Sequence, residues 1–329
     1  MPDFSSGKRY YTYDAYLKKT FGQKCLKIAL DGGFTCPNRD GRAGFGGCAF
    51  CGGGGAENPL GSRGRPTPSD GGARSFASPA PPLPLRLQYE KGREALSKKW
   101  GEHPAIVSFS SYTSTYAPVS VLRALYDEAL SFPDVVGLTV STRPDALPPD
   151  VLDLLSGYAA RTVLTVELGL QTVCDEVARR LNRGYPYSVF LEAFSALRAR
   201  GIRVCVHLID GLPGEGREEM LASARALAAL APDGVKFHEL YLRRGAALAD
   251  AWLSKPFPLL SREEYVEILA SQIELLPPAT VVERITGDPL RSDAVAPLWA
   301  LDKKKTSALL DKTLAKRHSF QGICYNCTN

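Results

Sequence analysis

Short runs of β-branched and apolar residues alternate with longer amphipathic segments along most of the chain. The runs that predict buried strands are 26–30, 105–110, 135–141, 162–168, 202–209 and 234–242. One intervening segment places these apolar residues on a single helical face: Val189, Phe190, Ala193, Phe194 and Leu197. Six strand–helix units in succession predict an α/β fold with a parallel sheet, curved into a partial barrel. An open doubly wound sheet is the competing fold.

Three cysteines, Cys36, Cys48 and Cys51, lie in a glycine-rich segment directly after the first predicted strand. Loops that follow strand C-termini build the site in such folds, and glycine allows the backbone to wrap around a metal centre. Three thiolates leave one position open, which favours an iron–sulfur cluster with one exchangeable iron. The alternative is a zinc-stabilised loop whose fourth ligand is Cys25 or a histidine.

Length, net charge and cysteine content limit the kinds of protein that this sequence can encode. The chain has 329 residues, a net charge of +5 and eight cysteines, and it has no apolar leader or run long enough to span a bilayer. These features predict a soluble protein of the reducing cytoplasm, with no membrane partner and with cysteines used for metal binding or catalysis.

Three segments stand outside the strand–helix pattern. Residues 52–85 are rich in Gly, Pro, Ser and Ala, which predicts a mobile insertion. Residues 302–317 form a basic helix candidate. A second C-x-x-C pair, Cys324 and Cys327, indicates an auxiliary metal or redox site or a disordered tail. We therefore divide the chain into an N-terminal basic and aromatic segment (1–25), a core (26–280) and a C-terminal extension (281–329).

Motifs spread over nearly the whole chain resemble the YhcC-like radical S-adenosylmethionine (SAM) proteins, which are related to the catalytic subunit of Elongator. They are KRYYTYDAYLKKTFG, LDGGFTCPNRDG with GGCAFC, STYAPVSVLRALYDEAL, VGLTVSTRPDALP, VELGLQT, LNRGYPYSVF, CVHLIDGLPGE and ERITGDPLR. The eleven residues between Cys36 and Cys48 are typical of this branch and depart from the three-residue gap of most radical SAM enzymes.

The resemblance implies a partial (β/α)6 radical SAM barrel with a short basic C-terminal extension. Cys36, Cys48 and Cys51 would hold a [4Fe–4S] cluster, whose fourth iron is chelated by SAM. One electron, from a donor such as flavodoxin or ferredoxin, then cleaves SAM to a 5′-deoxyadenosyl radical that abstracts hydrogen from an unactivated carbon.

Three polar residues at the ends of predicted strands are candidate SAM ligands. Arg143 can bind the SAM carboxylate bidentately, or form a salt bridge with Asp145 or Glu167. Glu167 is an acid within an apolar strand, so it needs a partner, either SAM or Arg143. Gln171 can bind the same ligand or begin a helix.

The fifth and sixth strands supply further candidates. Strand alternation places His207 on one face, where it contacts SAM or substrate or else is a core histidine. Gly211 and Pro213 lie in GLPGE, which resembles the adenine-side turn of the family. Of His238 and Glu239, one must point away from the site. After the second strand, Ser110 and Ser114 stand where the family pattern has longer amides, so we assign them no role.

Two substrate classes remain. The first is tRNA, at the side chain of a wobble uridine, which the relation to Elongator suggests. Basic and aromatic patches support it: Lys8, Arg9, Tyr10, Tyr11, Tyr13 and Tyr16, and in the tail Lys303, Lys304, Lys305, Lys312, Lys316 and Arg317. The second class is a small metabolite or cofactor precursor. A zinc-bearing RNA-binding module that is not an enzyme is a third reading, which the STRPD and GLPGE motifs disfavour.

Overall fold

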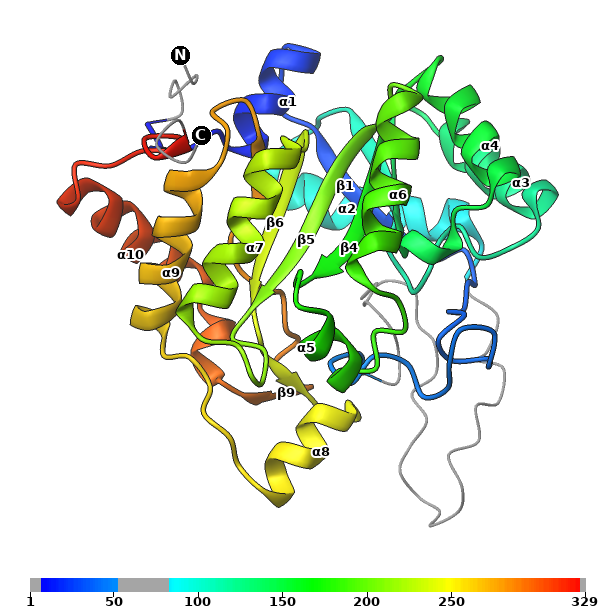
Figure 1. Cartoon of the computed structure of the whole chain (residues 1–329). Coiled ribbons are helices and arrows are strands. Elements are labelled where there is room, and N and C mark those ends of the chain that lie inside the picture. Colours follow the sequence, from blue (N-terminus) through cyan, green and yellow to red (C-terminus); the bar gives the residue numbers. More distant parts are fainter. Residues whose placement is uncertain (1–6, 53–82, 326–329) are drawn as a thin grey trace.

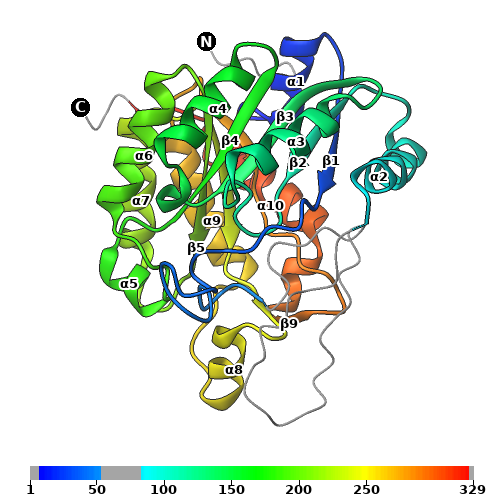
Figure 2. The same ribbon diagram turned by 90° about the vertical axis from the view of Figure 1, so that its right-hand side faces the viewer.

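The computed structural model describes residues 7–52 and 83–325. Seven parallel strands form one sheet in the order β1 (Leu26–Leu30), β2 (Ala105–Phe109), β3 (Val135–Thr142), β4 (Val163–Gln171), β5 (Arg203–Asp210), β6 (Gly234–Glu239) and β8 (Val281–Arg284). All six predicted strands are confirmed. The spatial order follows the chain and never reverses, whereas a doubly wound sheet reverses at a switch point. The sheet curls into a half barrel (Figures 1 and 2).

Helices cover the outer face of the curled sheet (Figure 1). These are α2 (Leu85–Trp100), α3 (Val119–Leu130), α4 (Pro149–Ala159), α6 (Tyr187–Ala199), α7 (Arg217–Leu230), α9 (Arg262–Leu275) and α10 (Lys303–Lys316). The remaining elements lie near the two ends of the strands. They are α1 (Tyr13–Phe21), α5 (Asp175–Arg180), α8 (Ala247–Ser254), the antiparallel pair β7 (Leu242–Arg243) and β9 (Ala294–Ala296), and two short 3-10 turns.

Local sequence signals set several helix ends. The Thr12 hydroxyl caps α1 by accepting a hydrogen bond from the Ala15 amide, and Gly22 ends the helix at a φ of 72°. Ser261 and Glu264 form a reciprocal capping box at the start of α9.

The two faces of the sheet differ in chemistry. Residues such as Val107, Val166 and Val206 are fully buried under the helices and form the main core. Residues of the opposite parity, such as Glu167 and Lys236, face the concave side and contact each other there. The half barrel therefore has a hydrophobic outer layer and a polar interior in which polar ligands can be bound.

The sheet extends beyond the predicted core boundary at residue 280. Strand β8 pairs with β6, with Gly234 opposite Val281, and α10 packs on α9. The segment that we assigned to a C-terminal extension therefore supplies a strand of the central sheet. Most of the predicted insertion (53–82) lies outside the described residues, and its last residue, Leu85, begins α2.

Helix α1 and the segment before it lie at the amino-terminal end of the strands (Figure 1). Tyr10 and Tyr11 are only 4% and 8% exposed, and Tyr13 stacks on Tyr16 with ring centroids 6.0 Å apart. Lys8 forms an ion pair with Asp311. The expected surface of stacking rings is therefore wrong for Tyr10 and Tyr11, because these two rings pack into the protein.

Candidate functional site

The cysteine loop follows β1 at the carboxyl end of the sheet, as the sequence predicts (Figures 1 and 2). A backbone hydrogen bond from Cys51 to Cys48, 2.9 Å long, closes a tight turn around the C-x-x-C pair. The loop is joined to its surroundings on both sides, because the Ala49 amide donates to Leu181 O at 2.8 Å while Ala49 O accepts from Leu248 at 2.9 Å. The cysteines thus lie on a braced loop.

The thiols of this loop influence one another. A hydrogen bond from Cys51 is the main cause that lowers the pKa of Cys48 to about 7. Burial opposes this shift, whereas the charge of Arg143 and the amide of Asn38 reinforce it. The same hydrogen bond, together with burial, raises the pKa of Cys51. A thiolate at Cys48 near neutral pH is the form that binds metal.

Cys25 lies too far from the cysteine loop to be the fourth ligand of the zinc alternative. Cys25 directly precedes β1, so the five residues of that strand, roughly 16 Å of extended chain, separate it from the loop. Among the described residues, no three His, Cys, Asp or Glu side chains converge tightly enough to hold a single ion. Three cysteines on one loop, with two hydrogen-bond donors at Cys48, fit a larger cluster that is bound on one side.

Arg143 lies at the end of β3, where its guanidinium contacts two different groups. Its Nε and Nη2 atoms donate to Asp145 at 2.9 and 2.7 Å, and its Nη1 lies 3.8 Å from Cys48 Sγ. Of the two salt bridges predicted for Arg143, the one to Asp145 forms. Within the described residues, Glu167 pairs with lysines and not with Arg143. The guanidinium edge formed by Nε and Nη2, which was expected to bind the SAM carboxylate, is therefore paired with Asp145. The Nη1 atom points toward the cysteine loop.

Glu167 is the centre of the polar interior. Lys27 Nζ lies 2.5 Å from its Oε1, Lys236 contacts the same oxygen, and Ser141 Oγ donates to Oε2 at 2.8 Å. Burial alone would raise the pKa of Glu167, but the charges of Lys236 and Lys27 outweigh it and hold the pKa well below its usual range. The partner that this buried acid requires is thus a pair of lysines, which the sequence analysis did not identify.

Two histidines extend the interior toward the carboxyl end. His207 Nε2 lies 3.4 Å from Glu167 Oε2, and the His207 ring stacks on His238 at 5.8 Å. Burial is the first cause that lowers the pKa of both imidazoles. Glu239 points to the other face, where its Oε2 accepts from the Gly287 amide at 2.8 Å. The expectation that one residue of the His238 and Glu239 pair points away is confirmed.

The remaining predicted SAM contacts lie at the same end of the sheet. Gln171 ends β4 with a φ of 65°, and its Oε1 accepts from Tyr185 at 3.3 Å, so it does not begin a helix. Gly211 has a φ of 84°. The Glu215 amide donates to Leu212 O at 3.0 Å, and Pro213 and Gly214 occupy the centre of that turn. The predicted tight turn is confirmed.

Three polar residues near the cysteines escaped the sequence analysis. Asn38 is fully buried beside Cys48, and Asn182 and Arg183 lie in a segment that crosses the cysteine loop. Their motifs, CPNRDG and LNRGY, were part of the family resemblance, yet no local signal indicated that the two segments meet.

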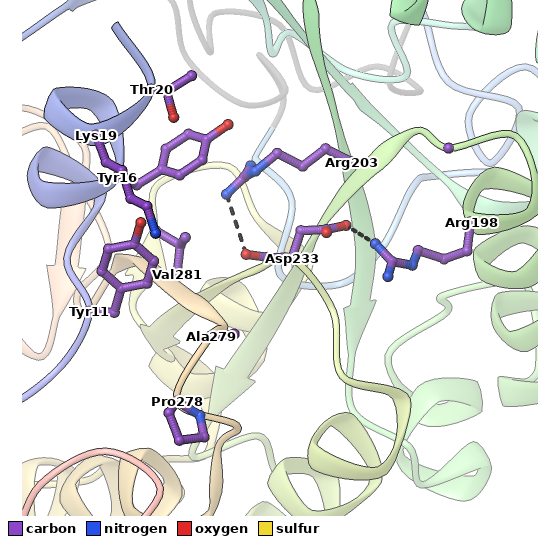
Figure 3. Close-up of a pocket in the computed structure, with 11 residues that line it drawn as sticks. Tyr11, Tyr16, Lys19, Thr20, Arg198, Arg203, Asp233, Pro278, Ala279 and Val281 are labelled. Atoms are coloured by element: carbon purple, nitrogen blue, oxygen red, sulfur yellow. Dashed lines mark hydrogen bonds and ion pairs between the residues drawn. The ribbon is translucent and has the colours of Figure 1, made fainter. Parts of the chain in front are cut away.

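A cavity of about 810 Å³ lies at the opposite, amino-terminal end of the strands (Figure 3). Arg198 in its wall pairs with the Asp233 carboxylate, and Arg203 donates to the backbone oxygen of Asp233 at 3.4 Å. Tyr16 lies against Arg203, whose guanidinium is 4.4 Å from the ring centroid. The length of the strands separates this cavity from the cysteine loop, so the candidate site is the carboxyl end.

Comparison with known protein families agrees with this geometry. The family described as "Radical SAM superfamily" matches residues 36–227, a range that begins at the first cysteine of the loop. The chain belongs to the radical SAM superfamily. A second match, "Radical_SAM C-terminal domain", covers residues 232–316. Members of this superfamily are enzymes that use a [4Fe–4S] cluster and SAM.

Full-length relatives place the chain among YhcC-like radical SAM proteins. YtqA of Bacillus subtilis is 38% identical over 321 residues, covering 98% of this chain and 94% of that protein. YhcC of Escherichia coli K12 is 35% identical over 310 residues, covering 93% and 92%. Mouse Elongator complex protein 3 is 33% identical over 195 residues, which are 57% of this chain and 34% of that protein.

The fold is shared with a solved structure. Archaeal Elp3 from Methanocaldococcus infernus, with an N-terminal deletion, superposes with a TM-score of 0.61 at 20% identity, covering 71% of this chain and 59% of the other. Every helix in the described part of this radical SAM protein is too short or too polar to cross a membrane.

Proposed function

We propose that this radical SAM enzyme binds its cluster through Cys36, Cys48 and Cys51 and modifies tRNA at the side chain of a wobble uridine. The observation that carries the cluster assignment is the braced cysteine loop at the carboxyl end of the half barrel. There the Cys48 sulfur lies 3.6 Å from Asn38 Nδ2 and 3.8 Å from Arg143 Nη1. Donors at a sulfur ligand support a cluster that must accept an electron.

When bound, a [4Fe–4S] cluster and SAM together supply a 5′-deoxyadenosyl radical, after one electron from a donor such as flavodoxin or ferredoxin. The chain's own residues have to bind SAM, orient it and exclude water. We assign SAM binding to Gln171, which ends β4, to His207 within β5, and to the turn after β5 that contains Gly211 and Pro213. Arg143 contributes through its Nη1 atom.

We assign Glu167 an indirect role in SAM binding. Both of its oxygens are already engaged by Lys27, Lys236 and Ser141. Its carboxylate therefore orients His207 and keeps two lysines in the interior, which gives the substrate a fixed polar wall.

Support for a tRNA substrate comes from the similarity to Elongator complex protein 3 and from α10. The exposed residues Lys303, Lys304 and Lys305 form the first turn of this helix. Three cations at the positive end of a helix dipole destabilise the helix, so their presence favours a role in binding anions. Lys303 pairs with Asp288, in the loop that carries Gly287, whose amide binds Glu239 at the end of β6. The lysines thus lie toward the carboxyl end, where the cysteine loop is.

The first test is anaerobic reconstitution with iron and sulfide, reduction, and measurement of 5′-deoxyadenosine formed from SAM. We expect product with the wild type and none with Cys48→Ala. Full cluster content in Cys48→Ala, or full activity, would refute the ligand assignment.

The second test measures binding of tRNA over a range of salt concentrations. Replacing Lys303, Lys304 and Lys305 with alanine should weaken binding and reduce the salt slope by roughly one for each phosphate that is no longer neutralised. The matched control replaces three lysines of α2, Lys91, Lys98 and Lys99, and should leave the slope unchanged. Absent or salt-insensitive binding by the wild type would favour the small-metabolite class instead.

A further inference from the structure

A segment that follows α5 lies across the cysteine loop and holds it through both backbone and side chain. This latch segment comprises residues 181–185. Asn182 Nδ2 donates to the carbonyl oxygens of Phe45 and Gly47, each at 2.9 Å. The Ala49 amide donates to Leu181 O at 2.8 Å. The position of the cysteines therefore depends on a part of the chain that is 135 positions away.

Asn38 is the residue through which the latch segment reaches a cysteine. Its Nδ2 donates to Asn182 O at 2.5 Å and lies 3.6 Å from Cys48 Sγ. A carbonyl oxygen only accepts hydrogen bonds, so the nitrogen of the Asn38 amide must face Asn182 O. This contact fixes the amide orientation and directs the second N–H toward the Cys48 sulfur.

The side chain of Asn38 is enclosed by its neighbours, and its nitrogen rather than its oxygen forms the hydrogen bonds. The side chain is 0% exposed, and among the described residues its Oδ1 has no hydrogen-bond partner. A Cβ at Gly44 would lie 2.3 Å from this oxygen, and one at Gly184 would lie 3.1 Å from it. A buried acceptor without a partner is costly. We therefore attribute the presence of an amide in this pocket to its two N–H groups, which donate to Asn182 O and to Cys48 Sγ.

Arg143 provides a second donor to the same sulfur, and it too is held by neighbours. Asp145 binds its Nε and Nη2, and the ring of Tyr185, at the end of the latch segment, lies 4.8 Å from the guanidinium carbon. Both donors that reach Cys48 are thus oriented by groups other than the cysteine loop.

We propose that Asn38 is a positioning residue whose N–H···S hydrogen bond to Cys48, fixed by the latch segment, raises the reduction potential of the bound cluster. The proposal rests on the proposed ligation of the cluster by Cys48. Reduction adds one electron from the external donor to the cluster and increases negative charge on its sulfur ligands. A donor at one of these sulfurs stabilises the reduced form more than the oxidised form, so the potential becomes less negative.

The test is a redox titration of the reconstituted protein, monitored by electron paramagnetic resonance, with iron and sulfide content measured on the same samples. Asn38→Leu keeps the approximate shape and removes both donors, so we expect a more negative midpoint potential at full iron content. Asn38→Gln keeps the donor group and should restore part of the shift. Ala43→Ser, at an exposed position of the same loop, is the control and should titrate like the wild type.

A midpoint potential equal to that of the wild type in fully loaded Asn38→Leu would overturn the proposal. Should that variant load too little iron to titrate, Gly44→Ala decides in the same way, because its Cβ displaces the Asn38 amide and leaves the donor in the chain. Failure of the proposed ligation itself would look different, since Cys48→Ala would then retain a full cluster.

Discussion

Lys27 Nζ lies 2.5 Å from Glu167 Oε1, although β1 and β4, which carry these residues, are separated by two other strands. In a flat sheet, three strand spacings would place the two backbones roughly 14 Å apart. The contact is made across the concave side of the curled sheet. Lys236 reaches the same carboxylate from β6. Glu167 therefore joins three strands of the half barrel at one point.

Replacing Glu167 with glutamine should destabilise the fold strongly. The change leaves Lys27 and Lys236 close together in the interior, with Glu283, 4.0 Å from Lys27 Nζ, as the remaining carboxylate near them among the described residues. Loss of one partner from a buried ion pair typically costs about 3–5 kcal/mol of unfolding free energy, which chemical denaturation measures. Glu128→Gln, at an exposed site, should change it by less than about 0.5 kcal/mol. Equal effects of the two substitutions would contradict the central role of Glu167.

Two buried acids behind the sheet, Asp210 and Glu239, should each contribute a loss of stability as pH rises from 5 to 8. Burial raises the pKa of Asp210 to about 8 and that of Glu239 to about 7. The unfolded chain titrates these groups near pH 4, so the folded state binds more protons between pH 4 and 8. Deprotonation in that window therefore favours unfolding.

The measurement for this pair is the thermal midpoint as a function of pH. The double variant Asp210→Asn and Glu239→Gln should show a smaller fall between pH 5 and 8 and a higher midpoint at pH 8. Glu192→Gln, on the surface of α6, is the control and should follow the wild type. If the thermal midpoint of the double variant fell as steeply with pH as that of the wild type, other groups would be responsible for the pH dependence.

Arg183→Lys should loosen the latch segment. Arg183 is 1% exposed, and its guanidinium donates to the carbonyl oxygens of Leu170, Thr172 and Tyr185. Lysine lacks the planar fork that makes these contacts together, so we expect a loss of about 3 kcal/mol. Hydrogen exchange should also become faster in the cysteine loop. The exposed variant Arg179→Lys should change neither quantity, and a wild-type exchange rate in Arg183→Lys would contradict the coupling.

Gly211→Ala should destabilise the turn that follows β5. Gly211 has a φ of 84°, and a Cβ there would lie 3.0 Å from Leu260. Forcing an L-residue into this conformation costs about 1–2 kcal/mol. The same substitution at Gly157, in the last turn of α4 with nothing near its Cβ position, should stabilise the protein by up to about 0.5–1 kcal/mol. Urea denaturation of both variants tests the difference in sign, and two shifts of the same sign would exclude the strain argument.

The sequence by itself predicted the six strands, the parallel half barrel and the cysteine loop at the carboxyl end of the sheet. Alternation of apolar and polar residues is local, and it sufficed to place His207 on one face of its strand. Cys36, Cys48 and Cys51 are likewise close in sequence, so their grouping could be read directly.

Only the tertiary structure decided which residues meet inside the half barrel and over the cysteine loop. Lys27, Lys236 and Glu167 are far apart in the chain, and the curvature of the sheet, which no local pattern encodes, brings them together. The contact between Asn38 and Asn182 spans 144 positions and depends on the path of the segment after α5. The tyrosines near residue 10 mix with cations in the sequence as in an RNA-binding surface, but they are buried because β8 and α10 pack beside them. Burial depends on neighbours distant in sequence, and for that reason local composition predicted chemistry at the cysteines but misassigned the surface at the N-terminus.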